Sequence, residues 1–484
     1  MSDAGTTAEA RTYDVVVIGA GPVGENVADR TRAAGLSTVV VESGLVGGEC
    51  SYWACEPSKA LLRPVLARAD ARGIPGLREA VAGPLDVEAV LAHRDAMSAH
   101  WDDSAQVAWL ASVSVDLIRG HGRLDGPKRV TVTTPEGGTV RLTARHAVAI
   151  TTGTAAAVPD LPGLAATRHW TSREATTADR APGRLAIVGG GVVATEMATA
   201  WQALGSRVTL LVRDERLLPR MEPFAGELVA DALREAGADV RLGVSVTDVK
   251  RAGGDDGEVT LFLDDGGELV ADEVLFATGR APRTGDIGLE SIGLDPGQWL
   301  PVDDSGLVTD TPGGWLYAVG DVNRRALFTH QGKYQARMAG AAIAARAAGE
   351  PADERRWGRH VATADTSAVP HVVFTHPEVA SVGLTTLEAQ QSGRRIDVVD
   401  YDLARLAGAH QYTEGYRGTA RMLVDADRGT VVGATFAGPG VAELLHSATV
   451  AIVGEVPLDR LWHAVPAFPT ISEVWLRLLE TYRG

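Results

Sequence analysis

The feature that most constrains the fold of this chain is a glycine-rich turn between a strand and a helix, which occurs twice. At its first occurrence, the apolar run 15–18 leads into Gly19, Gly21 and Gly24, then a helical stretch, then a second apolar run that ends on Glu42. Such glycines let the backbone approach a pyrophosphate at the helix N-terminus, and such an acid accepts hydrogen bonds from a ribose. The pattern therefore predicts a dinucleotide-binding strand–helix–strand unit. The alternative is a unit whose glycines serve only the turns.

The second occurrence has the same spacing but ends on a base. Its residues are, in order, Gly189, Gly191 and Ala194, then Arg213 at the end of the second strand, with Arg216 and Arg220 beyond. Alanine is acceptable at the third position because helix–strand packing needs only a small residue there. Arginines at the strand end can pair with a 2′-phosphate, which favours NADPH over NADH at this second unit. The alternative is a solvated basic loop.

Composition excludes several classes of protein. A length of 484 residues is enough for roughly three domains, and 45% hydrophobic with 22% charged residues is typical of a soluble globular protein. The net charge of −16 argues against a nucleic-acid surface and gives no polybasic signal for a membrane. The N-terminal residues lack an apolar signal region, and no run of about 18 apolar residues follows. We therefore expect a cytoplasmic protein without a membrane span.

Only two cysteines occur in the chain, Cys50 and Cys55, in the stretch "GGECSYWACEPSK". In an ideal helix, residues five apart have Cα atoms about 8–9 Å apart, whereas a disulfide needs less than about 7 Å. If the two cysteines pair, the residues between them must leave helical geometry. A helix beginning near Cys55 would lower the pKa of a thiolate there. No metal site is predicted, because two cysteines without histidines at ligand spacing cannot complete a zinc site.

Several motifs follow one another in a recognisable order. They are "GAGPVG" with Glu42, "GGECSYWACEPSK", "GGGVVATE", "YAVGD", "VVFTHPEVASVG" and "GATFAGPGVAELL". Two further strands each end in a Thr-Gly turn, at Gly153 and Gly279. From about residue 12 to its end, the chain resembles the flavin-dependent pyridine nucleotide-disulfide oxidoreductases. That family includes glutathione reductase, mycothione reductase, dihydrolipoamide dehydrogenase and mercuric reductase.

The resemblance implies an α/β fold with two Rossmann-like dinucleotide-binding domains, one for FAD and one for NAD(P), and a C-terminal α+β dimerisation domain. The implied boundaries are 12–165 for the first part of the FAD domain and 166–285 for the NAD(P) domain. A second FAD-binding or central part would cover 286–352, and the interface domain would cover 357–484. A homodimer is expected.

The resemblance also implies roles for individual residues. Cys55 is expected to face the flavin, and Cys50 to be the thiol that meets the substrate. Lys59 is expected near flavin N5, paired with Glu196 close to the nicotinamide. The predicted catalytic residues are Cys50, Cys55, Lys59, Glu196, His463 and Glu473. The predicted cofactor-binding residues are Gly19, Gly21, Gly24, Glu42, Lys59, Gly153, Gly189, Gly191, Glu196, Arg213, Arg216, Arg220, Gly279, Gly320 and Asp321.

The C-terminal segment departs from the family pattern. Disulfide reductases of the family carry His-Pro-Thr-x-x-Glu, whose histidine protonates the leaving thiolate, and here Phe468 stands in the histidine's place while Glu473 remains. In one interpretation, His463 replaces the missing acid. In a second, which we prefer, the leaving group needs no acid, as with a thione-type disulfide such as ergothioneine disulfide. In a third, the acceptor is a quinone or another non-disulfide.

The predicted function is therefore an FAD-dependent, NADPH-using reductase of a small-molecule disulfide. The alternatives are an NAD(P)H quinone reductase or diaphorase, a dihydrolipoamide dehydrogenase-like enzyme, which Phe468 and Arg213 disfavour, and a flavoprotein that serves only as a binding module. Mercury is not expected as the substrate, because the chain ends "LLETYRG" without the cysteine pair of the mercury enzymes. Glu49 and Glu56 flank the cysteines and would attract a cationic or zwitterionic substrate, although nearby carboxylates disfavour thiolate.

Overall fold

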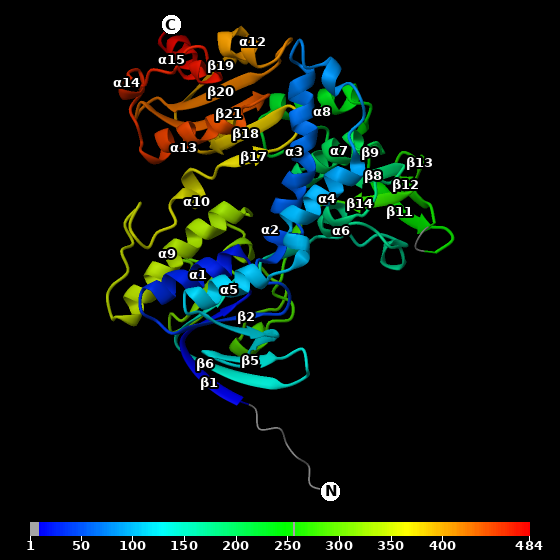
Figure 1. The fold of residues 1–484 in the computed structure, drawn as a ribbon. Helices are drawn as coiled ribbons and strands as arrows, with labels where there is room; N and C mark the ends of the chain where they lie inside the picture. Colours follow the sequence, from blue (N-terminus) through cyan, green and yellow to red (C-terminus); the bar gives the residue numbers. More distant parts are fainter. Residues whose placement is uncertain (1–8, 255–256) are drawn as a thin grey trace. The chain divides into compact units, whose positions relative to one another are not determined.

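The computed structural model describes residues 9–254 and 257–484 (Figure 1). The chain forms two compact units, each built from three separate stretches of sequence. The first unit contains residues 9–56, 98–155 and 280–365. The second contains the described residues of 57–97, 156–279 and 366–484. Each unit holds one of the two glycine-rich turns.

The first unit is organised by a mostly parallel sheet in the order β3-β2-β1-β6-β5-β4, with β16 also paired to β6. Its parallel strands are β1 (Glu9–Ile18), β2 (Thr38–Glu42), β3 (Asp116–Arg119), β6 (Thr139–Ile150) and β16 (Leu316–Ala318). The antiparallel strands are β4 (His121–Leu124) and β5 (Arg129–Thr133). A small two-stranded sheet joins β7 (Thr154–Ala156) and β15 (Arg280–Pro282).

The apolar run of β1 lets this sheet bury both of its faces, because its side chains point alternately to one face and the other. Val15 and Val17 of β1 pack with helices α1 (Pro22–Ala33), α5 (Ser104–Ser112) and α9 (Thr329–Ala347), which lie together along one side of the sheet in Figure 1. Val16 and Ile18 belong to the core on the other face, with residues of β4 and β5. Successive strand residues point to opposite faces, so one apolar run supplies two cores. The glycine-rich turn follows directly at the carboxyl end of β1.

The second unit also contains a parallel sheet with helices, but a smaller one. Its parallel sheet has the order β10-β9-β8-β14, formed by β10 (Asp239–Leu242), β9 (Arg207–Val212), β8 (Arg184–Val188) and β14 (Glu273–Phe276). Helices α6 (Ser172–Thr177), α7 (Val192–Ala203) and α8 (Pro223–Glu235) belong to it. An antiparallel sheet of β11 (Val246–Arg251), β12 (Val259–Leu263) and β13 (Glu268–Ala271) follows. The core includes the fully buried Trp201.

The C-terminal part of the second unit is an α+β domain. Its antiparallel sheet has the order β17-β18-β21-β20-β19. The strands are β17 (His371–Val373), β18 (Glu378–Gly383), β19 (Ile396–Asp402), β20 (Thr419–Asp425) and β21 (Thr430–Gly438). The helices are α11 (Thr386–Gln391), α12 (Ala407–Tyr412), α13 (Leu445–Val453), α14 (Leu458–Leu461) and α15 (Val474–Arg483). The α/β class with two nucleotide-binding folds and a C-terminal α+β domain, predicted from the sequence, is confirmed.

Helices α3 (Cys55–Arg72) and α4 (Val87–Met97) lie in sequence between β2 and β3, and the short α10 (Ala364–Ser367) precedes β17. The charged stretch around α10 has the composition of a linker, but part of it is packed. The buried Asp365 carboxylate accepts a hydrogen bond from Gln331 at 2.7 Å and lies 3.1 Å from the Arg325 guanidinium. Among the described residues, no helix is both long and apolar enough to cross a membrane.

Candidate active site

The two cysteines lie on either side of a break between two helices. A short helix, α2 (Gly48–Tyr52), contains Cys50, and α3 starts at Cys55. Trp53 leaves helical geometry, with φ −137° and ψ 2°. The predicted departure from helical geometry between the cysteines is therefore confirmed. Both cysteines are free thiols in this structure.

Tyr52 and Trp53 stand between the cysteines, and Tyr52 has a packing role. The Tyr52 side chain is buried, and its hydroxyl donates to the carbonyl of Val46 at 3.1 Å. The indole N–H of Trp101 donates to the Tyr52 carbonyl at 3.1 Å. These bonds tie α2 to the loop before it and to the segment after α4, so the position of Cys50 is set by buried neighbours.

The sulfur atoms have one hydroxyl neighbour that the sequence did not reveal. The Thr329 hydroxyl lies 3.4 Å from the Cys55 sulfur. A hydrogen bond to Cys55 raises the pKa of the Cys50 thiol; burial, the charge of Cys55 and the nearby Glu56 act in the same direction, and Thr329 opposes them. Cys50 therefore holds its proton more strongly than an ordinary thiol does.

The two acids that flank the cysteines differ in their partners. Glu49 forms an ion pair with Arg283 at 2.6 Å. Glu56 is exposed, and no ion pair joins it to any residue in the described part of the chain. The charge of Glu49 is thus compensated within the first unit, whereas the charge of Glu56 is not compensated by an ion pair among the described residues.

The first glycine-rich turn holds the predicted acid firmly. The Glu42 carboxylate accepts hydrogen bonds from the backbone N–H groups of Ala20 at 2.6 Å and Gly44 at 2.7 Å. Next to this turn, Glu25 was not predicted as a site residue. Burial raises the pKa of Glu25 to about 7; the positive charge of Lys333 lowers it, and the negative charge of Glu42 raises it further.

Asp321 lies in a polar cluster of the first unit. Its carboxylate accepts a hydrogen bond from the Thr154 hydroxyl at 2.8 Å, and Arg280 donates to the same hydroxyl at 2.9 Å. Burial raises the pKa of Asp321 and lowers that of Arg280. Thr154 and Arg280 directly follow the two predicted Thr-Gly turns, at Gly153 and Gly279. That adjacency is the sequence signal that could have identified them.

Lys59 and Glu196, 137 residues apart in sequence, form an ion pair in the second unit. The Lys59 ammonium lies 2.8 Å from a carboxylate oxygen of Glu196. The other oxygen accepts a hydrogen bond from the backbone N–H of Phe374 at 3.0 Å, and the ammonium lies 5.0 Å from the centre of the Phe374 ring. Glu196 is buried, so the ion pair and the amide together satisfy its charge. The catalytic roles of both residues stay predictions.

The second glycine-rich turn ends in a loop with free positive charge. Arg213 and Arg220 are exposed, and neither forms an ion pair within the described residues. Arg216 instead donates to the carbonyl of Pro219 at 3.1 Å, within its own loop. Of the three arginines predicted for a 2′-phosphate, two are therefore uncommitted and one also supports the loop.

The C-terminal segment keeps the glutamate of the family pattern, Glu473, but presents the apolar Phe468 in place of the histidine. Glu473 is buried and bonded to Arg477 at 2.5 Å, and its other carboxylate oxygen has no partner among the described residues. Phe468 is 75% exposed. His463 is also exposed, in the segment after α14. Neither finding tests the predicted catalytic role of His463 or Glu473.

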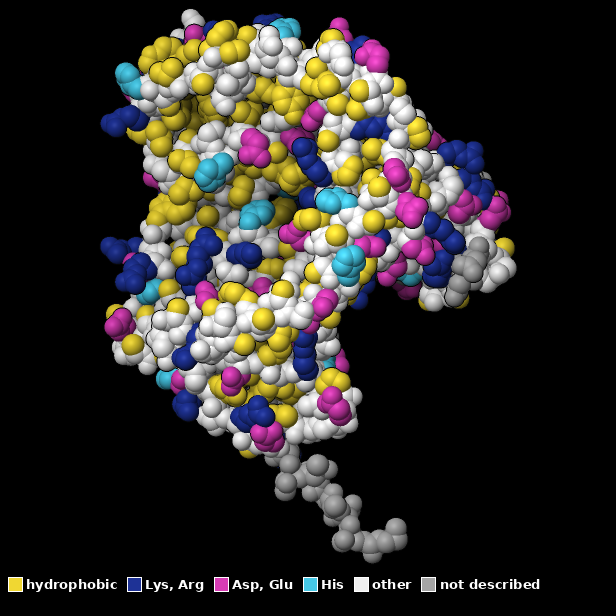
Figure 2. Space-filling model, in the orientation of Figure 1, with side chains coloured by type: hydrophobic (Ala, Val, Ile, Leu, Met, Phe, Trp, Pro, Cys, Tyr) yellow, Lys and Arg dark blue, Asp and Glu magenta, His cyan; other side chains and the backbone are white. Residues whose placement is uncertain are grey.

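Phe468 is one of several exposed apolar residues in this domain. Figure 2 shows hydrophobic side chains gathered over the C-terminal sheet and its helices. The exposed large apolar residues here include Val465 at 87%, Val450 at 54%, Val453 and Trp462. Exposed apolar side chains this numerous in one domain indicate a surface that another protein covers.

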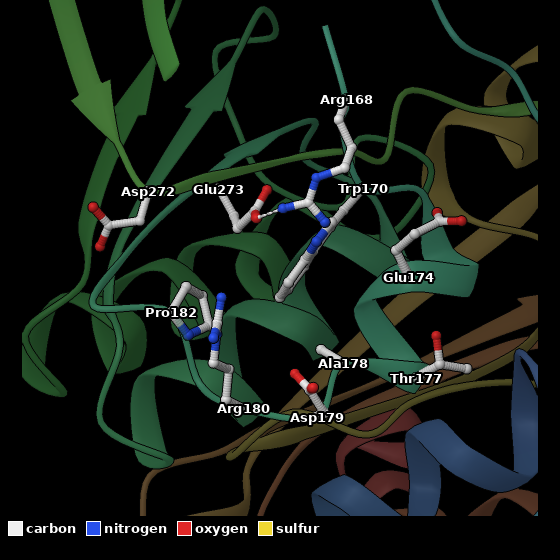
Figure 3. Close-up of a pocket in the computed structure, with 10 residues that line it drawn as sticks. All are labelled: Arg168, Trp170, Glu174, Thr177, Ala178, Asp179, Arg180, Pro182, Asp272 and Glu273. Atoms are coloured by element: carbon white, nitrogen blue, oxygen red, sulfur yellow. Dashed lines mark hydrogen bonds and ion pairs between the residues drawn. The ribbon is translucent and has the colours of Figure 1, made fainter. Parts of the chain in front are cut away.

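A cavity of about 500 Å³ lies elsewhere in the second unit, at the amino ends of β8 and β14 (Figure 3). An ion pair between Arg168 and Glu273 spans it, and Arg251 also binds Glu273 at 2.8 Å. Nucleotides bind at the carboxyl ends of parallel strands, which is the opposite edge of this sheet. None of the residues predicted for catalysis or cofactor binding lines this cavity. Its lining residues are Arg168, Trp170, Glu174, Thr177, Ala178, Asp179, Arg180, Pro182, Asp272 and Glu273.

The second glycine of each turn faces open space. A Cβ atom built on Gly21 or on Gly191 would meet no described atom within 4 Å. The helices that follow, α1 and α7, have no side-chain cap among the described residues, so their first N–H groups remain for a phosphate. With Glu42 at one turn and Arg213 at the other, the residues fit FAD at the first and a nicotinamide nucleotide at the second.

Comparison with known proteins agrees with this geometry. Residues 13–348 match the family described as pyridine nucleotide-disulphide oxidoreductase, and residues 369–478 match its dimerisation domain. Dihydrolipoyl dehydrogenase 3 of Pseudomonas aeruginosa is 32% identical over 468 residues, which is 96% of each chain. A mercuric reductase of Streptomyces lividans is 33% identical over 479 residues, covering 97% of this chain and 96% of that one.

A solved structure shares the fold over nearly the whole chain. It is the HOCl-induced flavoprotein disulfide reductase RclA from Escherichia coli, which superposes with a TM-score of 0.81 at 24% identity. The match covers 97% of this chain and 99% of RclA. At this identity the likeness concerns the fold.

Proposed function

Because this chain belongs to the pyridine nucleotide-disulphide oxidoreductase family, we propose that it reduces a small-molecule disulfide with NADPH through the Cys50–Cys55 pair. FAD, which Gly19, Gly21, Gly24 and Glu42 of the first turn would hold, would supply the transfer of an electron pair from NADPH to the cysteine disulfide. The observation that carries the proposal is the helix break between Cys50 and Cys55, because only that break lets cysteines five residues apart form a disulfide.

The dithiol then reacts by two exchange steps. The Cys50 thiolate attacks one sulfur of the substrate RS–SR, releases RS⁻ and forms a mixed disulfide. The Cys55 thiolate attacks the Cys50 sulfur, releases the second RS⁻ and restores the Cys50–Cys55 disulfide. Over one cycle, NADPH, one proton and RSSR give NADP⁺ and two RSH. Lys59 would lie near flavin N5 and its ion-pair partner Glu196 close to the nicotinamide, as the family resemblance implies.

The chemistry at position 468 limits which disulfides react well. A phenylalanine cannot protonate RS⁻, and general acid help is worth about 10²–10⁴-fold in rate. Disulfides whose leaving groups are stable without a proton should therefore be favoured, as with thione-type compounds such as ergothioneine disulfide. The uncompensated charge of Glu56 beside Cys50 favours a cationic or zwitterionic substrate.

The remaining proposals concern assembly and organisation. The match of residues 369–478 to a dimerisation domain and the exposed apolar side chains of that domain support a homodimer. We retain the division into an FAD domain (12–165 and 286–352), an NAD(P) domain (166–285) and an interface domain (357–484). A cytoplasmic location is also proposed, because a cysteine pair in that compartment is more often redox-active than structural.

The decisive test is an anaerobic titration with NADPH and, separately, NADH, followed by turnover assays. A long-wavelength thiolate–flavin absorption at two electrons per FAD is expected, with NADPH the efficient donor. Cys50→Ser should keep flavin reduction by NADPH but lose disulfide turnover. Unchanged disulfide turnover in Cys50→Ser would contradict the dithiol mechanism.

A variant at position 468 tests the choice of substrate. Phe468→His should raise the turnover of an alkyl disulfide such as cystamine by about 10- to 100-fold. The turnover of ergothioneine disulfide should change by less than about threefold, because its leaving group gains little from an acid. Equal changes for both disulfides would show that proton donation does not limit the reaction.

A quinone reductase is the second candidate, because Phe468 lacks the acid that disulfide reduction uses in the family. Such an enzyme would pass electrons from flavin directly to the acceptor. Quinone turnover that survives Cys50→Ser/Cys55→Ser, together with no turnover of any disulfide by the unmodified enzyme, would select it.

A further inference from the structure

We propose that Thr329 is a positioning residue of the redox centre, whose hydroxyl donates to the Cys55 sulfur and holds it as a thiolate. The Thr329 hydroxyl oxygen and the Cys55 sulfur are 3.4 Å apart, within hydrogen-bond range for sulfur. The two residues are separated by 274 positions and both belong to the first unit. This role deepens the proposed function and rests on it only in taking Cys55 as the sulfur that carries the charge.

The same hydroxyl also reaches the other cysteine. A hydrogen bond from Thr329 lowers the pKa of Cys50, against the larger effects that raise it. A single hydroxyl with one proton can serve only one sulfur at a time. When Cys50 donates its own proton to Cys55, the Thr329 proton provides a second donor to the Cys55 thiolate. When Cys50 leaves to form a mixed disulfide, Thr329 becomes the donor that remains.

The position of Thr329 in its helix adds to the effect. Thr329 is the first residue of α9, a helix of 19 residues. Phe328, which precedes it, provides no side-chain cap within the described residues. The uncapped N–H groups of a long helix carry partial positive charge, and a thiolate near them is stabilised. Thr329 places the Cys55 sulfur next to this end of α9, in addition to the start of α3 at Cys55 itself.

Charged groups around Cys55 act in both directions. From β15, the Arg280 guanidinium interacts with Cys55 and favours the thiolate. From α3, the carboxylate of Glu56 raises the pKa of Cys50, and the same repulsion opposes a thiolate at Cys55, its neighbour in sequence. From α2, the carboxylate of Glu49 is paired with Arg283. From α2, the Cys50 thiol is the remaining titratable neighbour. Because these charges oppose one another, the neutral hydroxyl of Thr329 should have a measurable effect on the pKa of Cys55.

The chain offers a clean background for the test, since Cys50 and Cys55 are its only cysteines. In FAD-loaded Cys50→Ser protein, every alkylation by iodoacetamide reports Cys55, and intact mass gives its extent. We compare Cys50→Ser alone with the same protein carrying Thr329→Val, Thr329→Ala or Thr329→Ser. The rate of alkylation against pH gives the midpoint at which the Cys55 thiolate forms. FAD content and far-ultraviolet circular dichroism verify that each variant is folded.

Thr329→Val and Thr329→Ala should both raise this midpoint by about 1 to 2 pH units, so that about 10- to 100-fold less thiolate exists well below it. Thr329→Ser should restore the midpoint to within about half a unit, because it keeps the hydroxyl. Equal midpoints for Val, Ala and Thr in folded, FAD-loaded proteins would overturn the proposal, and so would a raised midpoint in Thr329→Ser equal to that of Thr329→Val.

The test is separable from the proposed function. Alkylation of Cys55 needs neither NADPH nor a disulfide substrate. If the unmodified enzyme reduced no disulfide but the midpoint still moved with Thr329, the proposed substrate class would fail and the role of Thr329 would stand. If disulfide turnover were found and the midpoint did not move, the role of Thr329 would fail alone.

Discussion

The two glycine-rich turns of this protein share one backbone design and differ in the side chains that finish it. In both, the first glycine has a left-handed backbone, with φ +105° at Gly19 and +133° at Gly189. The second glycine of each faces open space. At the strand end, however, Glu42 is bound by two backbone N–H groups, whereas Arg213 is exposed and uncommitted. We propose that the backbone of each turn binds the pyrophosphate that the two cofactors share, and that the residue at the strand end distinguishes the rest of each cofactor.

The third position of each turn reveals a second difference. A Cβ atom on Gly24 would overlap the carbonyl oxygen of Gly19 and press on the Thr151 hydroxyl. Ala194, at the same position of the second turn, carries a Cβ and is completely buried. Helix α1 therefore lies closer to its turn than α7 does, and the two sites tolerate different residues although their spacing is identical.

The largest expected effect is at this third position. Gly24→Ala should leave the purified protein with little or no FAD and lower its stability by about 1–3 kcal/mol, because the added methyl group forces α1 away from the turn. The matched control, Ala194→Gly, should keep FAD fully bound and cost about 1 kcal/mol through helix propensity. Flavin absorbance per chain and urea unfolding measure both. Normal FAD content in Gly24→Ala would show that both turns accept an alanine at the third position.

A smaller effect is expected at the strand end of the second turn. Arg213→Ala should raise KM for NADPH by about tenfold, because a charge-assisted bond to the 2′-phosphate is lost, and should leave KM for NADH unchanged. Arg180→Ala is the control, since Arg180 is an exposed arginine of the same unit at the opposite edge of the sheet. Flavin reduction under steady-state conditions gives both constants. An equal rise in KM for NADPH and NADH would show that Arg213 supports only the structure of the loop and does not bind the 2′-phosphate.

The smallest expected effect on function concerns the residue after each third position, Glu25 in the first turn and Thr195 in the second. Burial raises the pKa of Glu25 to about 7 from its ordinary 4.5. Between these values the unfolded chain loses the proton and the folded chain keeps it, so the stability that Glu25 contributes falls as pH rises from about 4.5 to 7. Glu25→Gln should therefore gain about 2–3 kcal/mol of stability over the unmodified protein at pH 8 and little at pH 4.5. Urea unfolding at both pH values checks this, and an equal gain at both would rule out titration of Glu25.

Local patterns predicted the elements that hold the site. The apolar run 15–18 forms the carboxyl end of β1, the run 185–188 forms all of β8 except Arg184, and the glycine turns follow both as expected. The break between Cys50 and Cys55 was predictable from helix geometry, since a disulfide and an unbroken helix are incompatible over that spacing. Each of these features depends on residues within about 30 positions of one another.

The composition of the active site was less accessible from the sequence. Arg216, which the motif predicts for a phosphate, also donates to the carbonyl of Pro219 in its own loop, a contact that the sequence did not indicate. Arg280 and Thr154 support Asp321 from two other segments, which the motifs marked only by their neighbouring glycines. The amide of Phe374 completes the binding of Glu196 from 178 residues away.

Two strand–turn–helix units, a paired redox cysteine motif and a missing histidine at Phe468 were determined by the sequence alone, because repeating apolar periods, glycine spacing and residue identity are local properties. The contact of Thr329 with Cys55, the compensation of Glu49 but not of Glu56, and the closer approach of α1 at Gly24 were decided only by the tertiary structure. These depend on which distant segments the packed sheets bring together, and no local pattern encodes the distance between two side chains that lie hundreds of residues apart.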